Sequence, residues 1–108
     1  MLIATTNELV GYELTEVLGE VMGLTVRSRN IGSQIGAGVK SILGGELKGM
    51  TKALVESREQ VMQRMVEEAE AKGADAIVAM RFDTSDMGNG WTEICAYGTA
   101  VRARKLSA

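Results

Sequence analysis

The stretch from residue 46 to residue 73, ELKGMTKALVESREQVMQRMVEEAEAKG, decides the fold, because no other long segment keeps its apolar residues at a helical period. Apolar residues recur at steps of three, four and seven, which predicts an amphipathic helix over 47–73. The stripe predicted to face the core comprises Met50, Leu54, Val61, Met65 and Ala69, widened by Met62 and Val66. The face predicted to meet water carries Glu56, Glu59, Arg64, Glu67 and Glu70. The rest of the chain is therefore expected to pack on one side of this helix.

A glycine-rich segment, 30–49, precedes the helix. Its apolar residues are spaced for a short helix over 33–43, which the Gly44-Gly45 pair would end. It does not match a phosphate-binding loop, because the GxG at 36–38 lacks its third glycine and a valine interrupts the GVKS at 38–41. The sequence leaves open whether this segment lines a pore or packs between subunits.

Four further segments are rich in β-branched and aliphatic residues. Residues 1–6 predict a short first strand at a sheet edge. Residues 12–29 fit either two strands broken near Gly19 or one long bent strand with a bulge there. After Gly73, which suits a helix stop, residues 76–83 and 91–104 predict an antiparallel hairpin around the polar turn 84–90. We therefore expect one α+β domain over 1–108, an antiparallel sheet with the helices on one face.

The last predicted strand is apolar on both faces, with small residues at Ala96, Gly98 and Ala100. In so short a chain one sheet face normally meets water, so the second cover is expected from another copy of the chain. This pattern predicts a homo-oligomer, and closed symmetry is its usual form.

The composition of the chain limits the classes of partner that it is expected to bind. The 108 residues carry 12 basic and 14 acidic side chains, a net charge of −2, so the overall field attracts neither nucleic acid nor an anionic membrane. Arg102, Arg104 and Lys105 form a small basic cluster that we interpret as a solvated strand end. Apolar runs fall short of the roughly 18 residues that span a bilayer. A single cysteine and the lack of an export-type leader predict a cytoplasmic protein.

The chain offers little for catalysis. It has no histidine, so a His-based triad and the usual Cys/His zinc site cannot form within one subunit. Cys95 has no evident base to activate it, and no enzymatic activity is expected. Asp83, Asp86 and Glu93 flank the predicted turn and are expected to be solvated, although repeated around a ring they could hold a hard cation or support carboxylate chemistry.

Two further sets of side chains are candidate sites. Cys95 and methionines from several subunits could bind Cu(I) or another soft ion around a symmetry axis, and Met87 is the methionine that packing explains least. The competing interpretation is that these side chains only fill the core. Arg58, beside the helix stripe, and Arg81, after a buried strand, are expected to pair with Asp83, Glu93 or a neighbouring subunit, or to contact an anion.

Several short stretches together resemble the YbjQ-like family, also called UPF0145. They are 44–47, 57–58, 64–65, 68–69, 73–78, 81–85 and 97–101, which read GGEL, SR, RM, EA, GADAIV, RFDTS and YGTAV. The resemblance covers nearly the whole chain. It implies a small α+β subunit of dodecin-like topology in a homo-pentameric ring, a domain labelled heavy-metal-binding, and no established enzymatic activity.

Overall fold

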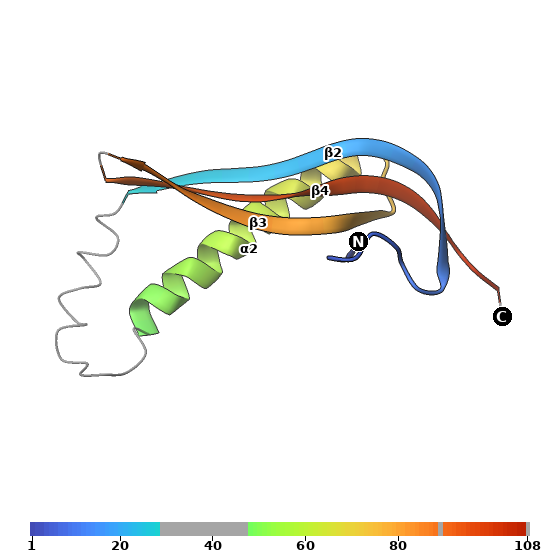
Figure 1. Ribbon diagram of the computed structural model, residues 1–108, viewed down its shortest axis with the longest axis horizontal. Helices are drawn as coiled ribbons and strands as arrows, with labels where there is room; N and C mark the ends of the chain where they lie inside the picture. The colour runs from blue at the N-terminus through green and yellow to red at the C-terminus, as the bar shows by residue number, and fades with distance from the viewer. Residues whose placement is uncertain (29–47, 89, 108) are drawn as a thin grey trace.

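The computed structural model describes residues 1–28, 48–88 and 90–107 (Figure 1). Within these ranges the elements are β1 (Leu2–Ile3), β2 (Tyr12–Ser28), α2 (Lys48–Ala71), β3 (Ala76–Gly88) and β4 (Trp91–Lys105). They form one four-stranded sheet in the order β1-β3-β4-β2 with α2 against one face. The α+β class is confirmed, and the predicted short helix over 33–43 lies outside the described residues.

The sheet is mixed rather than wholly antiparallel, which corrects the prediction. β4 pairs antiparallel with both β2 and β3, whereas β1 runs parallel to β3 at the edge. The N-terminal segment adds to β3 at an irregularity where Ala79 adopts a φ of 54°. There the Ala79 N–H donates to the Thr6 carbonyl at 2.8 Å and the Met80 N–H to the Ala4 carbonyl at 3.0 Å. These bonds fix the direction of β1, which no sequence period could indicate.

The helix ends as its sequence predicts. Gly73 adopts a φ of 77°, in the left-handed region that favours glycine. Its N–H donates to the Glu70 carbonyl at 2.9 Å, and the Ala74 N–H donates to the Ala69 carbonyl at 3.1 Å. This pair of bonds is a Schellman motif, and it turns the chain directly into β3.

The core lies between α2 and the centre of the sheet. Val61, Met65 and Ala69 are fully buried on the helix and pack with Val21 and Ile77 among other strand residues. The approach is closest at Gly23, where an added Cβ would lie 1.8 Å from the Val61 carbonyl oxygen. Only glycine lets the helix backbone lie so close to β2.

The predicted helix stripe is wrong at Leu54, which is 53% exposed. In Figure 1 the N-terminal turns of α2 diverge from the sheet, while the C-terminal turns lie against it. Leu54 therefore follows the helical period but has no strand beneath it among the described residues. The buried stripe instead continues to Ser57, which is 5% exposed.

Of the two alternatives for 12–29, the single bent strand is observed. β2 is continuous, with register irregularities between Leu14 and Glu16 and between Val17 and Gly19, where Gly19 has a φ of 109°. Strand β3 extends to Gly88, so the predicted turn 84–90 begins too early. Pairing continues through the polar residues because exposed strand positions do not need apolar side chains.

Candidate functional site: the open face of the sheet

One sheet face lies against α2 and the other lacks a helix in the described part of the chain. Because Gly23 faces the helix and strand side chains alternate, Met22, Leu24 and Val26 point to the opposite side. Met22 pairs with Tyr97, and Trp91, the first residue of β4, lies on the same side. We call these five residues, Met22, Leu24, Val26, Trp91 and Tyr97, the open face. Each is between 37% and 50% exposed.

Cys95 lies within the open face, opposite Leu24 on β2 and Asp83 on β3, and is 5% exposed. Burial raises the pKa of its thiol above the ordinary 9.0, and the negative charges of Glu93, Asp83 and Glu20 raise that pKa further. The thiol is therefore protonated at neutral pH. A protonated thiol is a poor nucleophile and a poor metal ligand.

Three carboxylates, Glu20, Asp83 and Glu93, surround the open face. Register places Glu93 opposite Val26 and Asp83 opposite Cys95. Among the described residues none of the three has a cationic partner. Asp86, predicted beside Asp83 and Glu93, alternates to the other side of β3, where its Oδ1 accepts from the Gly88 N–H at 2.9 Å. The structure thus separates the predicted acidic trio.

The structure does not bring Cys95 and Met87 together within one chain. Met87 lies four residues beyond Asp83 on β3, which is about 13 Å at the usual rise of a strand. Its side chain is 55% exposed near the end of the hairpin. Met22 is the methionine that lies diagonally across from Cys95 on the open face.

Arg58 contacts an aromatic ring instead of a carboxylate. Its guanidinium carbon lies 4.9 Å from the Phe82 ring centroid, a cation–π contact between α2 and β3. Beside this pair is a hollow of about 400 Å³, which we call the helix groove. Its apolar lining is Ile3, Val55, Met62, Val66 and Phe82, and its polar lining is Arg58, Glu59 and Gln63.

Arg81 ties the N-terminal segment to β3. Its Nη1 donates to the carbonyl oxygens of Thr5 and Met80, each at 2.8 Å. Like Arg58, it makes no ion pair with Asp83 or Glu93 in the part of the chain that the structure describes. Both contacts hold elements together, and neither needs a ligand.

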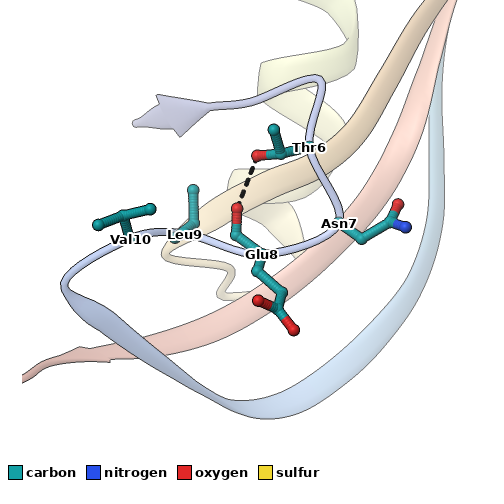
Figure 2. Close-up of a pocket in the computed structure, with 5 residues that line it drawn as sticks. All are labelled: Thr6, Asn7, Glu8, Leu9 and Val10. Atoms are coloured by element: carbon teal, nitrogen blue, oxygen red, sulfur yellow. Dashed lines mark hydrogen bonds between the residues drawn. The ribbon is translucent and has the colours of Figure 1, made fainter.

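A second hollow, of about 430 Å³, is formed by the loop that follows β1 (Figure 2). Its lining is five successive residues, 6–10, and the Thr6 hydroxyl donates to the Glu8 carbonyl at 2.6 Å. Leu9 packs against the core cluster of Ala76, Val78 and Val101. The loop closes on itself and brings no set of chemically active groups together.

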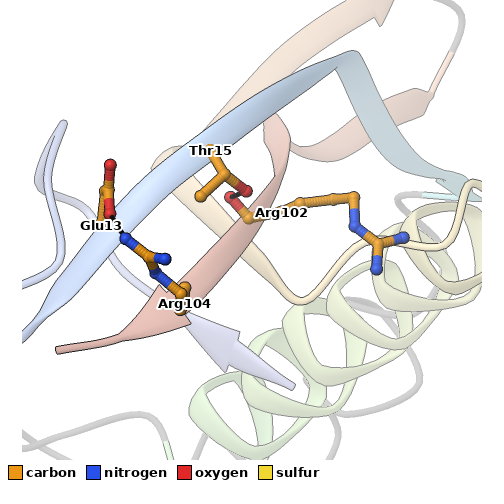
Figure 3. Close-up of polar contacts among 4 residues, drawn as sticks. All are labelled: Glu13, Thr15, Arg102 and Arg104. Carbon is orange, nitrogen blue, oxygen red and sulfur yellow. Dashed lines mark hydrogen bonds and ion pairs between the residues drawn. The ribbon is translucent and has the colours of Figure 1, made fainter. Parts of the chain in front are cut away.

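The basic cluster at the end of β4 is engaged locally (Figure 3). Arg104 forms an ion pair with Glu13 on β2, and the Arg102 Nη1 donates to the Gly73 carbonyl at 3.2 Å beyond the end of α2. The Thr15 hydroxyl bonds to the Arg102 carbonyl at 3.4 Å. These contacts agree with our interpretation of the cluster as a strand end.

Sequence reasoning missed the open face as a unit. It noted Met22, Leu24 and Val26 only as aliphatic residues of a strand. The available signal was Gly23, which marks the side of β2 that another backbone approaches and so assigns its neighbours to the opposite side.

The fold and this site define a class: a small α+β protein whose sheet, in the described ranges, has one face covered by a helix and one uncovered apolar face. A family model described as "Putative heavy-metal-binding" matches residues 1–104. The chain is 68% identical over 107 residues to a UPF0145 protein of Acidothermus cellulolyticus, covering 99% of both chains. It is 56% identical over 106 residues to the UPF0145 protein YjfJ of Lactococcus lactis, covering 98% of this chain and 97% of that protein.

The chain belongs to the UPF0145 family, as its resemblance implies. A solved structure from Pediococcus pentosaceus, of a DUF74-family protein of unknown function, is 17% identical and superposes with a TM-score of 0.54. The match covers 96% of this chain and 98% of that chain, which supports the fold. No helix in the described ranges is long and apolar enough to cross a membrane.

The described side chains of this chain do not by themselves form a site that fits the heavy-metal label. Across residues 1–28, 48–88 and 90–107, no three Cys, Asp or Glu side chains are grouped to hold an ion. The one thiol is buried among carboxylates that favour its protonated form. A soft ion would need thiolate and thioether ligands at bonding distance, which one chain does not assemble here.

Proposed function

We propose that this protein is a cytoplasmic homo-oligomer, a pentamer by family resemblance, that binds a ligand or holds a partner at its subunit interfaces and central channel without turning over a substrate. The observation that carries this proposal is the open face, where five large apolar side chains lie exposed on adjacent strands. Soluble monomers rarely expose an apolar patch of this kind, and such patches mark interaction sites.

The dimensions of the chain support assembly. Its Cα radius of gyration is 17.5 Å, whereas a compact domain of this length has about 13 Å. The principal extents are 55, 30 and 17 Å. A flat, elongated subunit buries less of its own apolar surface than a round one, and packing against copies of itself compensates for this.

A non-enzymatic role is supported by the chemistry of the described residues. The sequence has no histidine, and Cys95 is held protonated without a base beside it. The carboxylates Glu20, Asp83 and Glu93 flank a flat face rather than an enclosed cleft. The relatives carry family names without an activity.

Soft-metal binding is the alternative, and the register of two residues favours it. Met22 lies diagonally across from Cys95 on the open face, so a symmetry axis at this face would gather several thioether and thiol groups. The ion would have to displace the thiol proton that the surrounding carboxylates retain. Ligands from at least two subunits are required.

Native mass spectrometry of protein purified without added metal tests both ideas. The scaffold proposal expects an oligomer whose mass does not change on titration with Cu(I), Zn(II) or Cd(II) under reducing conditions. Leu24→Asp, at a half-exposed position, should dissociate the oligomer into folded subunits. Cys95→Ser is the matched control: stoichiometric metal uptake that this change abolishes supports the metal alternative, and a monomeric wild type refutes assembly.

A further inference from the structure

The two edges of the sheet are covered unequally. At the β2 edge, Arg64 and Lys72 of α2 donate to two outward carbonyl groups. At the other edge, the backbone bonds between the N-terminal segment and β3 end at Met80, whereas β3 continues to Gly88 (Figure 1). In the described ranges no strand lies beside residues 82–86, which we call the β3 edge.

The register of β3 and β4 shows which backbone groups the β3 edge presents. On β4 the Val101 carbonyl faces β3, because it accepts from the Asp75 N–H. Every second residue of an antiparallel strand faces the same neighbour, so the odd-numbered residues of β4 direct their backbone groups to β3. They pair with odd-numbered residues along the β3 edge, so Phe82, Thr84 and Asp86 direct their N–H and C=O groups outward.

Several of these outward groups are open to a new strand. The Thr84 N–H donates to the Asp83 Oδ1 at 2.9 Å. The N–H and C=O groups of Phe82 and the Thr84 carbonyl have no partner in the described part of the chain. An edge of this kind is a template for pairing with another chain. The ladder with β4 is irregular on both sides of this stretch, so only a short segment fits along it.

A hollow lies beside the β3 edge on the helix side. Phe82 lines the helix groove, and so does Ile3 of β1, which occupies the neighbouring edge position earlier along β3. Residues paired across a sheet point to the same side. The side chain that an added strand places beside Phe82 would therefore enter the groove, whose wall on α2 includes Val55, Met62 and Val66. An apolar side chain is favoured there.

The other side of the β3 edge carries a carboxylate. Asp83 points to the open face and makes no ion pair within the described ranges. Burial and then nearby carboxylates, that of Asp83 among them, raise the pKa of the Cys95 thiol, so the potential on this side is negative. The guanidinium of Arg81 already donates to two carbonyl groups, and Arg64 and Lys72 lie at the far edge of the sheet. A basic side chain is favoured here.

We infer that the β3 edge binds an extended peptide segment of a partner protein, in which apolar and basic residues alternate. The segment adds a strand to the sheet. Its main chain bonds to Phe82 and Thr84, its apolar side chains enter the helix groove, and its basic side chains lie beside Asp83. A second copy is disfavoured, because two paired β3 edges would bring Asp83 and Asp86 of both copies together. This edge is distinct from the open face, so binding there does not depend on assembly.

Amide hydrogen exchange of the full ¹⁵N-labelled chain, followed by NMR, tests this inference with a blocked heptapeptide that alternates valine and lysine. The Phe82 N–H has no partner among the described residues, so its exchange should slow about tenfold or more at saturating peptide. The same peptide with every backbone amide methylated keeps the side chains but cannot add as a strand, and it should give no protection. Equal protection by both peptides, or protection by neither, would overturn the inference.

Two substitutions at one position separate strand addition from the loss of a side chain. Thr84→Pro removes an N–H that does not belong to the ladder with β4, so the sheet should survive, which circular dichroism checks. The proline ring blocks the outer edge, so binding of the labelled peptide, measured by fluorescence anisotropy, should be lost. Thr84→Ala keeps both backbone groups and should bind as the wild type does. Equal binding by both variants would refute strand addition, and the two peptides on the wild type decide the question if Thr84→Pro does not fold.

Two further measurements test the chemistry and the identity of the occupant. A peptide with glutamate in place of lysine should bind about tenfold more weakly or worse, and equal binding would overturn the assigned chemistry. Protection of the Phe82 amide that rises with protein concentration, without peptide, would show that a second copy occupies the edge and would also overturn the inference. A monomeric wild type in native mass spectrometry would overturn the proposed oligomer but leave binding at the β3 edge unchanged.

Discussion

The contact between α2 and β2 makes Gly23→Ala the sharpest test of the fold. The new Cβ would lie 1.8 Å from the Val61 carbonyl oxygen and 2.8 Å from the Met65 amide nitrogen, both backbone atoms. Ordinary contact begins at 3.4 Å, so the helix must retreat by roughly 1.6 Å, the difference between those distances. A gap of that size removes a large part of the packing of Val61 and Met65, which are fully buried.

The expected loss follows from that gap. Burying a valine or methionine side chain contributes about 1.5–3 kcal/mol, and losing about half of that for two residues gives a destabilisation of about 1.5–3 kcal/mol. For a domain of this size that corresponds to a fall of roughly 10–20 °C in Tm. Urea unfolding followed by circular dichroism measures it, at one fixed subunit concentration because assembly adds to apparent stability.

Gly98→Ala is the matched comparison for this change. Its Cβ would meet the Cγ2 of Ile77 at 2.7 Å and the Val78 carbonyl at 3.1 Å, overlaps that are less severe than the 1.8 Å approach at Gly23. Its cost should be smaller, about 1 kcal/mol. If Gly23→Ala lowered the free energy of unfolding by less than Gly98→Ala does, the helix could not lie against β2 as described. The assignment of the open face would then fail as well.

Three further outcomes are expected. Met65→Ala should cost about 2–5 kcal/mol in the same urea assay because Met65 is fully buried, and Glu67→Ala, on the exposed face of α2, should cost under about 0.5 kcal/mol. The pKa of the Cys95 thiol is raised above 9.0, so the stability that the protonated thiol contributes is complete below about pH 9 and is lost as pH rises through the folded-state pKa. Cys95→Ser should therefore flatten that part of a profile of unfolding free energy against pH. An unchanged slope would contradict the burial of the thiol. The double change Arg64→Ala and Lys72→Ala should increase light scattering when the protein is concentrated, because these side chains cover carbonyl groups on the free edge of β2. Scattering equal to that of the wild type would show that this edge needs no cover.

How far the sequence predicts the structure depends on the range of the interaction. Local signals succeeded: the helical period located α2, and Lys72-Gly73 marked its end. The exposure of Leu54 could not be predicted, because periodicity shows which side of a helix is apolar but not how much of its length lies over a sheet. The pairing of β1 depends on backbone bonds to a distorted strand, which leave no pattern in the side chains.

For the candidate site too, the sequence predicts the chemistry but not the geometry. Its chemical limits were visible in composition, since a chain without histidine and with one cysteine has few routes to catalysis or metal binding. Its geometry was not visible, because register decides which carboxylates surround Cys95. Asp83 and Glu93 lie on the open face, while Asp86, three residues from Asp83 in sequence, alternates away from it.

The free edge of β2 limits how copies of the chain can associate. A long edge strand is a ready template for pairing with another chain, yet here α2 places two cations across it. The Arg64 Nη1 donates to the Leu24 carbonyl at 2.6 Å, and the Lys72 Nζ donates to the Glu20 carbonyl at 3.0 Å. These bonds occupy two of the outward carbonyl groups that strand addition would need, on the stretch of β2 that displays Met22 and Leu24. The edge is thus closed where the face is apolar, which favours association of subunits through faces rather than by extension of the sheet.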